Sequence, residues 1–178
     1  MIRKLFSIIT VTYNAESIVE NTMKSIFSQT YTNYEYIVID GNSTDDTVNI
    51  IQQYRDKIDI FICEKDNGIY DAMNKGIKFA TGQYINFMNC GDYFVNNEVL
   101  EKVSKKLQDD SAVIYGNAIY QTIVGKYKVY PCTIDKTIQR RMPFNHQCTF
   151  VKTEIAKNHL FDTSYKVSGD YKIGRAHV

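Results

Sequence analysis

The segment 84–94, YINFMNCGDYF, decides how the chain folds. Its first part, Tyr84 to Met88, is apolar and rich in β-forming residues, which is typical of a buried strand. The run stops at Asn89, and after Cys90 and a glycine comes a single carboxylate, Asp92. An Asp at a strand end is most often a turn or cap residue and less often a metal ligand. The residues on either side of this segment must decide between the two.

Strand-like and helix-like segments alternate on both sides of this run. Short apolar runs predict strands, and apolar residues at helical spacing predict helices. Ser43 is predicted to cap one helix, with Asp46 three residues later. Four such alternations with short links predict a Rossmann-like α/β fold, in which helices cover both faces of a mostly parallel sheet. The predicted strands are 5–12, 36–39, 58–63, 84–88 and 112–115, and the predicted helices are 16–29, one that follows Ser43, 69–80 and 97–107.

The pattern changes after Tyr115. Residues 118–122 and 126–130 flank Gly125 and predict a small antiparallel excursion, followed by a strand at 148–152 and a short helix at 154–158. No linker separates the two parts, so we expect one domain over residues 1–172. Residues 173–178, IGRAHV, break the preceding pattern and match a reading frame of a common sequencing adapter. We therefore expect a non-native tail and a natural protein that continues beyond Lys172.

The bulk composition is that of an ordinary globular protein. Of 178 residues, 44% are hydrophobic and 23% charged, and the formal net charge is +1. A charge this small argues against nucleic acid as a partner. The four cysteines have no metal-like spacing, and there is no signal peptide, so we expect a cytoplasmic location. No apolar run approaches the ~18 residues of a membrane span, which leaves attachment to the inner membrane face open.

Two carboxylates and one aromatic ring follow predicted strands. Asp40 and Asp92 each end a strand, and Tyr13 follows the first one. Parallel strands bring these ends to the edge where open α/β sheets bind ligands. The first turn has no glycine-rich phosphate motif, which disfavours dinucleotide and P-loop sites. A ring for a base, an acid for hydroxyl or N–H groups and an acid for a cation suit a nucleoside diphosphate.

Three segments in fixed order resemble glycosyltransferase family 2, the inverting enzymes with the GT-A fold. They are SIITVTYNAES (7–17), SIFSQTYTNYEYIVIDGNSTDDT (25–47) and EKDNGIYDAMNKGIKFATGQYINFMNCGDYF (64–94), and the last is similar to bacterial surface-polysaccharide members. The similarity runs from about residue 6 to residue 171. It implies an enzyme, a hexosyl or related transferase, that uses a nucleotide-sugar donor and Mn2+ or Mg2+.

The resemblance also implies roles for single residues. Tyr13, within the segment Thr12–Asn14, matches the aromatic that stacks on the nucleobase, and Asp40 matches an acid lining the nucleoside pocket. Asp92 matches the metal ligand of the DxD-type motif. Asp170 matches the catalytic base that deprotonates the acceptor.

The resemblance and the sequence pattern also bear on three further positions. His146 falls where relatives carry a histidine near the sugar or acceptor. Asp71 and Asn74 either line the nucleotide site or belong to an ordinary surface helix.

Two departures from the family pattern affect the prediction. Gly41 replaces an acid that in many relatives reads the base. Asn89 and Gly91 replace the other acids of the metal motif, so metal binding is expected to survive but weaken. Asn89 can still offer a carbonyl oxygen, and we expect it, with His146, in the region of the donor sugar or acceptor.

The function that follows is transfer of a sugar, with inversion, in cell-surface polysaccharide synthesis. The donor is a nucleotide-diphosphate sugar, with a UDP-sugar favoured, and the acceptor is a glycan or lipid-linked molecule. Two alternatives stay open. One is a sugar-nucleotide nucleotidyltransferase, although its usual glycine-rich loop is missing from TYNAES (12–17). The other is a nucleotide- or sugar-binding protein without turnover, which the reduced metal motif would suit.

Overall fold

The computed structural model describes residues 3–107, 111–122, 124–129 and 146–164. Within these residues, six strands form one sheet in the order β3-β2-β1-β4-β8-β5, and two form a separate hairpin. The strands of the sheet are β1 (Phe6–Thr12), β2 (Tyr34–Asp40), β3 (Ile60–Cys63), β4 (Tyr84–Phe87), β5 (Val113–Tyr115) and β8 (Thr149–Lys152). The helices are α1 (Val19–Phe27), α2 (Thr47–Gln52), α3 (Ile69–Phe79), α4 (Val99–Ser104) and α5 (Thr153–Asn158), with 3-10 turns η1 (Arg55–Lys57) and η3 (His146–Cys148).

The sheet is mixed. β1 pairs in parallel with β2 and β4, and β2 pairs in parallel with β3. β8 lies between β4 and β5 and runs antiparallel to both. The mostly parallel sheet is therefore confirmed. The reversed β8 has a consequence for the site, because its first residues lie at the edge where the parallel strands end.

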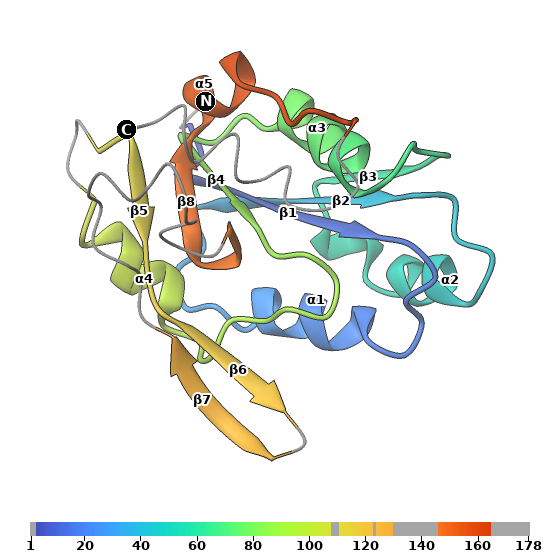
Figure 1. Cartoon of the computed structure of the whole chain (residues 1–178), viewed down its shortest axis with the longest axis horizontal. Coiled ribbons are helices and arrows are strands. Elements are labelled where there is room, and N and C mark those ends of the chain that lie inside the picture. Colours follow the sequence, from blue (N-terminus) through green and yellow to red (C-terminus); the bar gives the residue numbers. More distant parts are fainter. Residues whose placement is uncertain (1–2, 108–110, 123, 130–145, 165–178) are drawn as a thin grey trace.

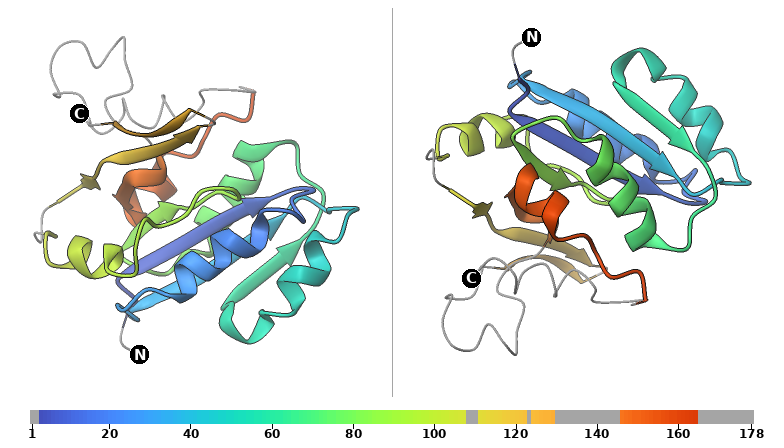
Figure 2. Two further views of the ribbon diagram at one scale, coloured as in Figure 1. Left: turned by 90° about the horizontal axis from the view of Figure 1, so that it is seen from below. Right: turned by 90° about the horizontal axis from the view of Figure 1, so that it is seen from above.

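Helices cover both faces of the sheet (Figure 1). α1, α2 and α4 pack on one face through Met23, Ile51 and Leu100, against strand residues such as Ile8. α3 and α5 pack on the other face, where the next strand residue, Ile9, points. Alternate residues of β1 thus enter opposite cores, as the period of a strand requires. The two-faced α/β prediction is confirmed, and Figure 2 shows the layers from both sides.

Close packing holds α3 on β1. A β-carbon at Gly76 would lie 2.5 Å from Cγ2 of Ile9, so only glycine permits this approach. The N-terminus of α3 and the loop that leads into it are thereby held near the carboxyl ends of β1 and β2.

The antiparallel excursion is also confirmed. β6 (Ala118–Thr122) and β7 (Gly125–Val129) form a hairpin that extends away from the sheet (Figure 1). The capping prediction at Ser43 is wrong, because α2 begins only at Thr47 and Ser43 bonds to Asp40 instead. None of the helices in the described part of the chain is long and apolar enough to cross a membrane.

Candidate functional site

The loops that follow β2 and β4 both bond to the last residues of β1. The backbone N–H of Cys90 donates to the carbonyl of Val11 at 3.2 Å, and that of Gly41 donates to the carbonyl of Thr12 at 2.9 Å. The turn that carries Asp92 and the end of the strand that carries Asp40 therefore flank the residue before Tyr13. The three strand-end residues expected from the sequence share one edge of the sheet.

Asp40 is fully buried, and both its carboxylate oxygens accept hydrogen bonds. The Ser43 hydroxyl donates to Oδ1 at 2.5 Å, and the Ser43 backbone N–H donates to Oδ2 at 2.8 Å. The Cys63 thiol, at the end of β3, donates to Oδ2 at 3.2 Å. Loss of water around the sulfur and the bond to Asp40 raise the pKa of the Cys63 thiol to about 11. Asp40 thus links the ends of β2 and β3 in this structure.

Asn14 connects the first loop to the second. Its φ of 46° is left-handed, a conformation that Asn tolerates better than most residues. Its backbone N–H donates to Ser43 Oγ at 2.9 Å, and its side-chain oxygen accepts from the Thr44 N–H at 2.8 Å. A continuous path of hydrogen bonds therefore runs from Asn14 through Ser43 to Asp40.

The Tyr13 ring is 61% exposed beside this network. Its Cδ2 atom lies 3.3 Å from the point that a β-carbon at Gly41 would occupy. A carboxylate oxygen of Asp66, from the loop between β3 and α3, lies 2.6 Å from the same point. The sequence analysis assigned no role to Asp66. The signal in the sequence was the motif Asp-Asn-Gly directly before α3, which is typical of an Asx turn.

The turn that carries Asp92 is tight and is anchored on α1. Gly91 has a φ of 97°, and the Asp92 N–H donates to the Asn89 carbonyl at 2.9 Å. The buried Thr22 hydroxyl accepts from the Gly91 N–H at 3.0 Å and donates to the Asp92 carbonyl at 2.8 Å. One side chain of α1 thus fixes both peptide groups of the turn.

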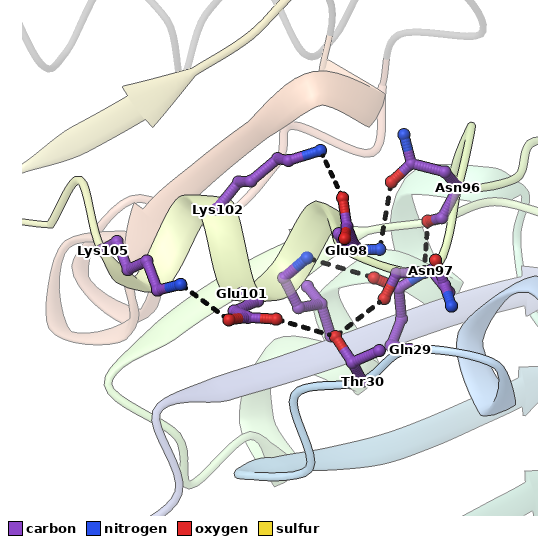
Figure 3. Close-up of polar contacts among 9 residues, drawn as sticks. Gln29, Thr30, Asn96, Asn97, Glu98, Glu101, Lys102 and Lys105 are labelled. Carbon is purple, nitrogen blue, oxygen red and sulfur yellow. Dashed lines mark hydrogen bonds and ion pairs between the residues drawn. The ribbon is translucent and has the colours of Figure 1, made fainter.

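Further residues of α1 and the segment that follows it hold the chain beyond Asp92. Ser25 Oγ accepts from the Phe94 N–H at 3.2 Å. The buried Gln29 amide donates to the Asn96 carbonyl at 2.8 Å and accepts from the Leu100 N–H at 3.1 Å, and Thr30 bonds to Asn97 (Figure 3). The segment 91–100 is therefore tied to α1 and to the residues that directly follow this helix.

His146 lies next to Asn89. The Asn89 Nδ2 atom is 3.2 Å from His146 Nε2. Because β8 runs antiparallel to β4, η3 and its His146 begin at the edge where β4 ends. The Asn89 Oδ1 atom is buried and accepts no hydrogen bond within the described residues, and the same holds for Thr12 Oγ1. A buried side-chain oxygen with no hydrogen-bond donor among the described residues thus lies at the end of β4.

The Asp92 carboxyl is half-buried close to His146. Burial raises the pKa of Asp92 above its ordinary value, while a hydrogen bond from Gln147 and the charge of His146 act in the opposite direction. A cation placed beside this carboxyl group would stabilise its charged form.

The oxygen atoms of this turn suit a cation that binds mainly to a ligand. Among the described residues, no three or more His, Cys, Asp or Glu side chains gather as a metal site. Mg2+ usually takes one or two carboxylates from the protein and the rest of its oxygens from phosphates and water. The Asp92 carboxylate and the unpartnered Asn89 Oδ1 provide such oxygens, so the residues present fit Mn2+ or Mg2+.

The other predicted residues have different surroundings. The Asp71 carboxylate accepts from the Asn67 N–H at 3.0 Å, within the loop before α3. The Asn74 amide donates to the carbonyl and accepts from the N–H of Phe161, both at 2.9 Å, so it joins α3 to the segment after α5. Asp170 and the tail 173–178 lie outside the described residues.

The family model for glycosyl transferase family 2 matches residues 7–164. The chain belongs to glycosyltransferase family 2. An Escherichia coli relative, the UDP-Glc:alpha-D-GlcNAc-diphosphoundecaprenol beta-1,3-glucosyltransferase WfgD, is 33% identical over 129 residues, 69% of this chain and 50% of the relative. A PGL/p-HBAD biosynthesis glycosyltransferase of Mycobacterium tuberculosis is 31% identical over 127 residues, 68% of this chain and 50% of the relative. The chain spans about half the length of the curated relatives it matches.

Solved structures of other proteins share the fold. TarS 1–349 of Staphylococcus aureus in complex with UDP has a TM-score of 0.75 at 22% identity, covering 97% of this chain and 55% of that one. The mannosyltransferase PcManGT of Pyrobaculum calidifontis, in complex with GDP-Man and Mn2+, has a TM-score of 0.71 at 18% identity, covering 96% and 50%. The GT-A fold predicted for this family 2 member is confirmed.

Proposed function

We propose that this family 2 member is a metal-dependent glycosyltransferase that uses a UDP-sugar to extend a glycan or a lipid-linked acceptor in surface polysaccharide synthesis. The observation that carries the proposal is the meeting of the loops after β2 and β4 on the last two residues of β1. This arrangement puts an exposed ring, Tyr13, and a half-buried acid, Asp92, on one edge of the sheet. In a nucleoside diphosphate a ribose joins the base to the diphosphate. Such a ligand needs a ring for its base and an acid for the cation on its diphosphate, as Tyr13 and Asp92 provide.

Each of the described site residues has its own role in this proposal. Tyr13 stacks on the base, and the loop containing Thr12 and Asn14 approaches the nucleoside. The bonds of Asp40 to Ser43 and Cys63 hold the floor of this site in place. Asp71 and Asn74 brace α3 and its preceding loop, so their contribution to nucleotide binding is to position that loop.

Asp92 and Asn89 would hold the divalent cation, which when bound neutralises charge on the diphosphate leaving group. His146, in contact with Asn89, lies where the donor sugar or the acceptor is expected. The resemblance makes Asp170 the base that removes the proton of the attacking acceptor hydroxyl, with inversion at the sugar. A positioned base of this kind contributes about 10²- to 10⁴-fold to the rate.

The relatives favour the donor and acceptor classes. WfgD is named for a UDP-glucose donor and a diphosphoundecaprenol acceptor, and TarS is solved with UDP. A lipid-linked acceptor would bring the protein to the inner face of the membrane. We propose that location for the protein in its working state.

Calorimetric titration of UDP, with and without Mn2+, tests the binding step. We expect Mn2+ to tighten UDP binding and Asp92→Asn to remove this effect. Transfer from UDP-glucose to a synthetic diphospholipid acceptor tests the reaction, and Asp170→Asn should lower its rate by about 10²- to 10⁴-fold. UDP binding without transfer or donor hydrolysis would support a binding protein. Formation of UDP-glucose from UTP and glucose 1-phosphate would instead support the nucleotidyltransferase alternative.

A further inference from the structure

Gly41 lies between two side chains that come from different loops. A β-carbon at this position would be 2.6 Å from Asp66 Oδ2 and 3.3 Å from Tyr13 Cδ2. The first distance is shorter than any normal contact, so a larger residue at position 41 would have to displace the Asp66 carboxylate. The glycine therefore creates the space into which Asp66 reaches, beside the exposed Tyr13 ring.

The Asp66 side chain is held with one oxygen committed and one oxygen available. Its Oδ1 accepts from the Gly68 N–H at 2.9 Å, which fixes the carboxylate against the start of α3. Its Oδ2 accepts no hydrogen bond within the described residues. The loop itself is braced by Lys75, whose ammonium group donates to the Lys65 carbonyl at 2.9 Å and pairs with Glu64 at 2.9 Å.

Asp40 is less suited than Asp66 to recognise a ligand. Both its oxygens already accept hydrogen bonds from Ser43 and Cys63, and its side chain is fully buried. Asp66 is only partly buried and has one oxygen available. Of these two carboxylates close to Gly41, only Asp66 has an oxygen that accepts no hydrogen bond within the described residues.

A single carboxylate oxygen fits particular nucleobases. Uracil and thymine present one N–H, at N3, between two carbonyl groups, and one acceptor satisfies it. Guanine presents two adjacent N–H donors, which match both oxygens of a carboxylate. Cytosine has a lone pair at N3, which a carboxylate oxygen repels. The chemistry therefore favours a uracil or thymine nucleotide over a guanine or cytosine nucleotide.

We propose that Asp66 is the specificity-determining residue of the donor site and that its Oδ2 accepts the N3–H of a uracil or thymine base stacked on Tyr13. The inference rests on the proposed function, since it needs a nucleotide at this edge of the sheet. It assigns the reading of the base to the loop before α3, and it explains why position 41 is glycine in this chain.

The test is calorimetric titration of the full chain with UDP, GDP and 3-methyluridine diphosphate, which lacks the N3–H. A hydrogen bond to a charged group predicts that the wild-type protein binds UDP about 10- to 100-fold more tightly than the methylated analogue. We expect Asp66→Asn, which can keep the acceptor for Gly68, to bind the two equally and weakly. GDP should bind more weakly than UDP to the wild-type protein. Asp56→Asn, which makes the same change at an exposed carboxylate of η1, is the control and should keep the preference for UDP.

The outcomes separate the two proposals. Equal binding of UDP and the methylated analogue by the wild-type protein, or a preference that survives Asp66→Asn, would overturn the role of Asp66 while the proposed function stands. Absence of UDP binding by the wild-type protein, with and without Mn2+, would overturn both.

A second pair of variants checks the geometry. Gly41→Asp alone should weaken UDP binding, because the new side chain collides with Asp66. Combining Gly41→Asp with Asp66→Ala removes the collision and moves the carboxylate to the other loop, so binding should recover at least in part. If the double variant binds UDP no better than Gly41→Asp alone, the two positions do not share the space described here and the proposal is wrong.

Discussion

The hydroxyl of Thr22 donates a hydrogen bond of 2.8 Å to the backbone carbonyl of Asp92 and accepts one of 3.0 Å from the N–H of Gly91. Thr22 is fully buried in α1. The position of the proposed metal ligand therefore depends on a helix that contributes no ligand itself. The backbone of the turn is held before any cation binds.

Thr22→Val keeps the shape of the side chain and removes both hydrogen bonds. Two partly buried backbone groups lose their partner, so the free energy of unfolding should fall by about 1–3 kcal/mol. The turn should also loosen, and we expect the enhancement of UDP binding by Mn2+ to weaken about tenfold, as for other residues that support a metal ligand. Denaturant unfolding and calorimetry measure the two effects.

Thr30→Val is the control for Thr22→Val. It removes a hydroxyl just beyond the same helix, where Thr30 bonds to Asn97 and Glu101 rather than to the turn (Figure 3). The response to Mn2+ should stay at the wild-type level. A Thr22→Val protein with an unchanged response to Mn2+ would show that the turn needs no support from α1.

Most of the fold could be predicted because its signals are local. The apolar run of β1 and the helical spacing in α3 depend on neighbouring residues, and both elements lie within two residues of their predicted bounds. The place of β8 could not be predicted in this way. It is four residues long, and its insertion between β4 and β5 is decided by packing with strands far away in the chain.

The site was harder to predict than the fold. Ser43 was expected to cap α2, but its hydroxyl lies closer to the buried Asp40 carboxylate, a stronger acceptor than a backbone group. Nothing in the sequence around Asn74 predicts its hydrogen bonds to Phe161, because the two residues are 87 positions apart. Strand ends could be assigned to a common edge, whereas the partner of each side chain depends on loops that meet only in the folded chain.

Asn89→Asp should strengthen cation binding. A carboxylate in place of the unpartnered Asn89 Oδ1 adds negative charge to the turn that carries Asp92. Divalent cation affinity rises with the charge of the ligand set, so we expect Mn2+ to bind about tenfold more tightly in the presence of UDP. Asn96→Asp is the matched control, because it makes the same change in an exposed loop where the side-chain oxygen accepts from Glu98. Equal Mn2+ affinities in the two variants would argue against Asn89 as part of the cation site.

Glu35 is a buried carboxylate at the opposite end of the sheet. It accepts hydrogen bonds from the Ser7 hydroxyl at 2.5 Å, from the backbone N–H groups of Thr81 at 2.6 Å and Gly82 at 3.0 Å, and from the Thr81 hydroxyl at 2.8 Å. Burial alone raises the pKa of Glu35, but these bonds outweigh it and lower the pKa below the ordinary 4.5. Glu35→Gln replaces one acceptor oxygen by a donor, so we expect a loss of about 2–3 kcal/mol in the free energy of unfolding at pH 7.

The same bonds predict how stability depends on pH. Because the pKa of Glu35 is lower in the folded protein, its contribution is complete above pH 4.5 and is lost as the pH falls through the folded value. The difference between wild type and Glu35→Gln should therefore shrink on acidification, in denaturant titrations at pH 7 and below pH 4. Glu98→Gln, at an exposed ion pair with Lys102, should change stability little at either pH. A difference between wild type and Glu35→Gln that stays constant with pH would contradict the assignment.

Cys63 should react slowly with alkylating reagents although the residue is exposed. Its thiol donates to Asp40 at 3.2 Å, and the raised pKa of about 11 leaves little thiolate near neutral pH. At pH 8 the thiolate fraction falls about 100-fold relative to a thiol of ordinary pKa, and the higher nucleophilicity of a more basic thiolate recovers about a factor of ten. Iodoacetamide labelling read by peptide mass spectrometry should therefore be about tenfold slower at Cys63 than at a free cysteine peptide.

Asp40→Asn removes the charge that opposes ionisation of the Cys63 thiol and should speed the labelling. If Cys63 in the unchanged protein is labelled as fast as the peptide, its bond to Asp40 does not persist in solution, and the network that links β2 to β3 is not formed as described.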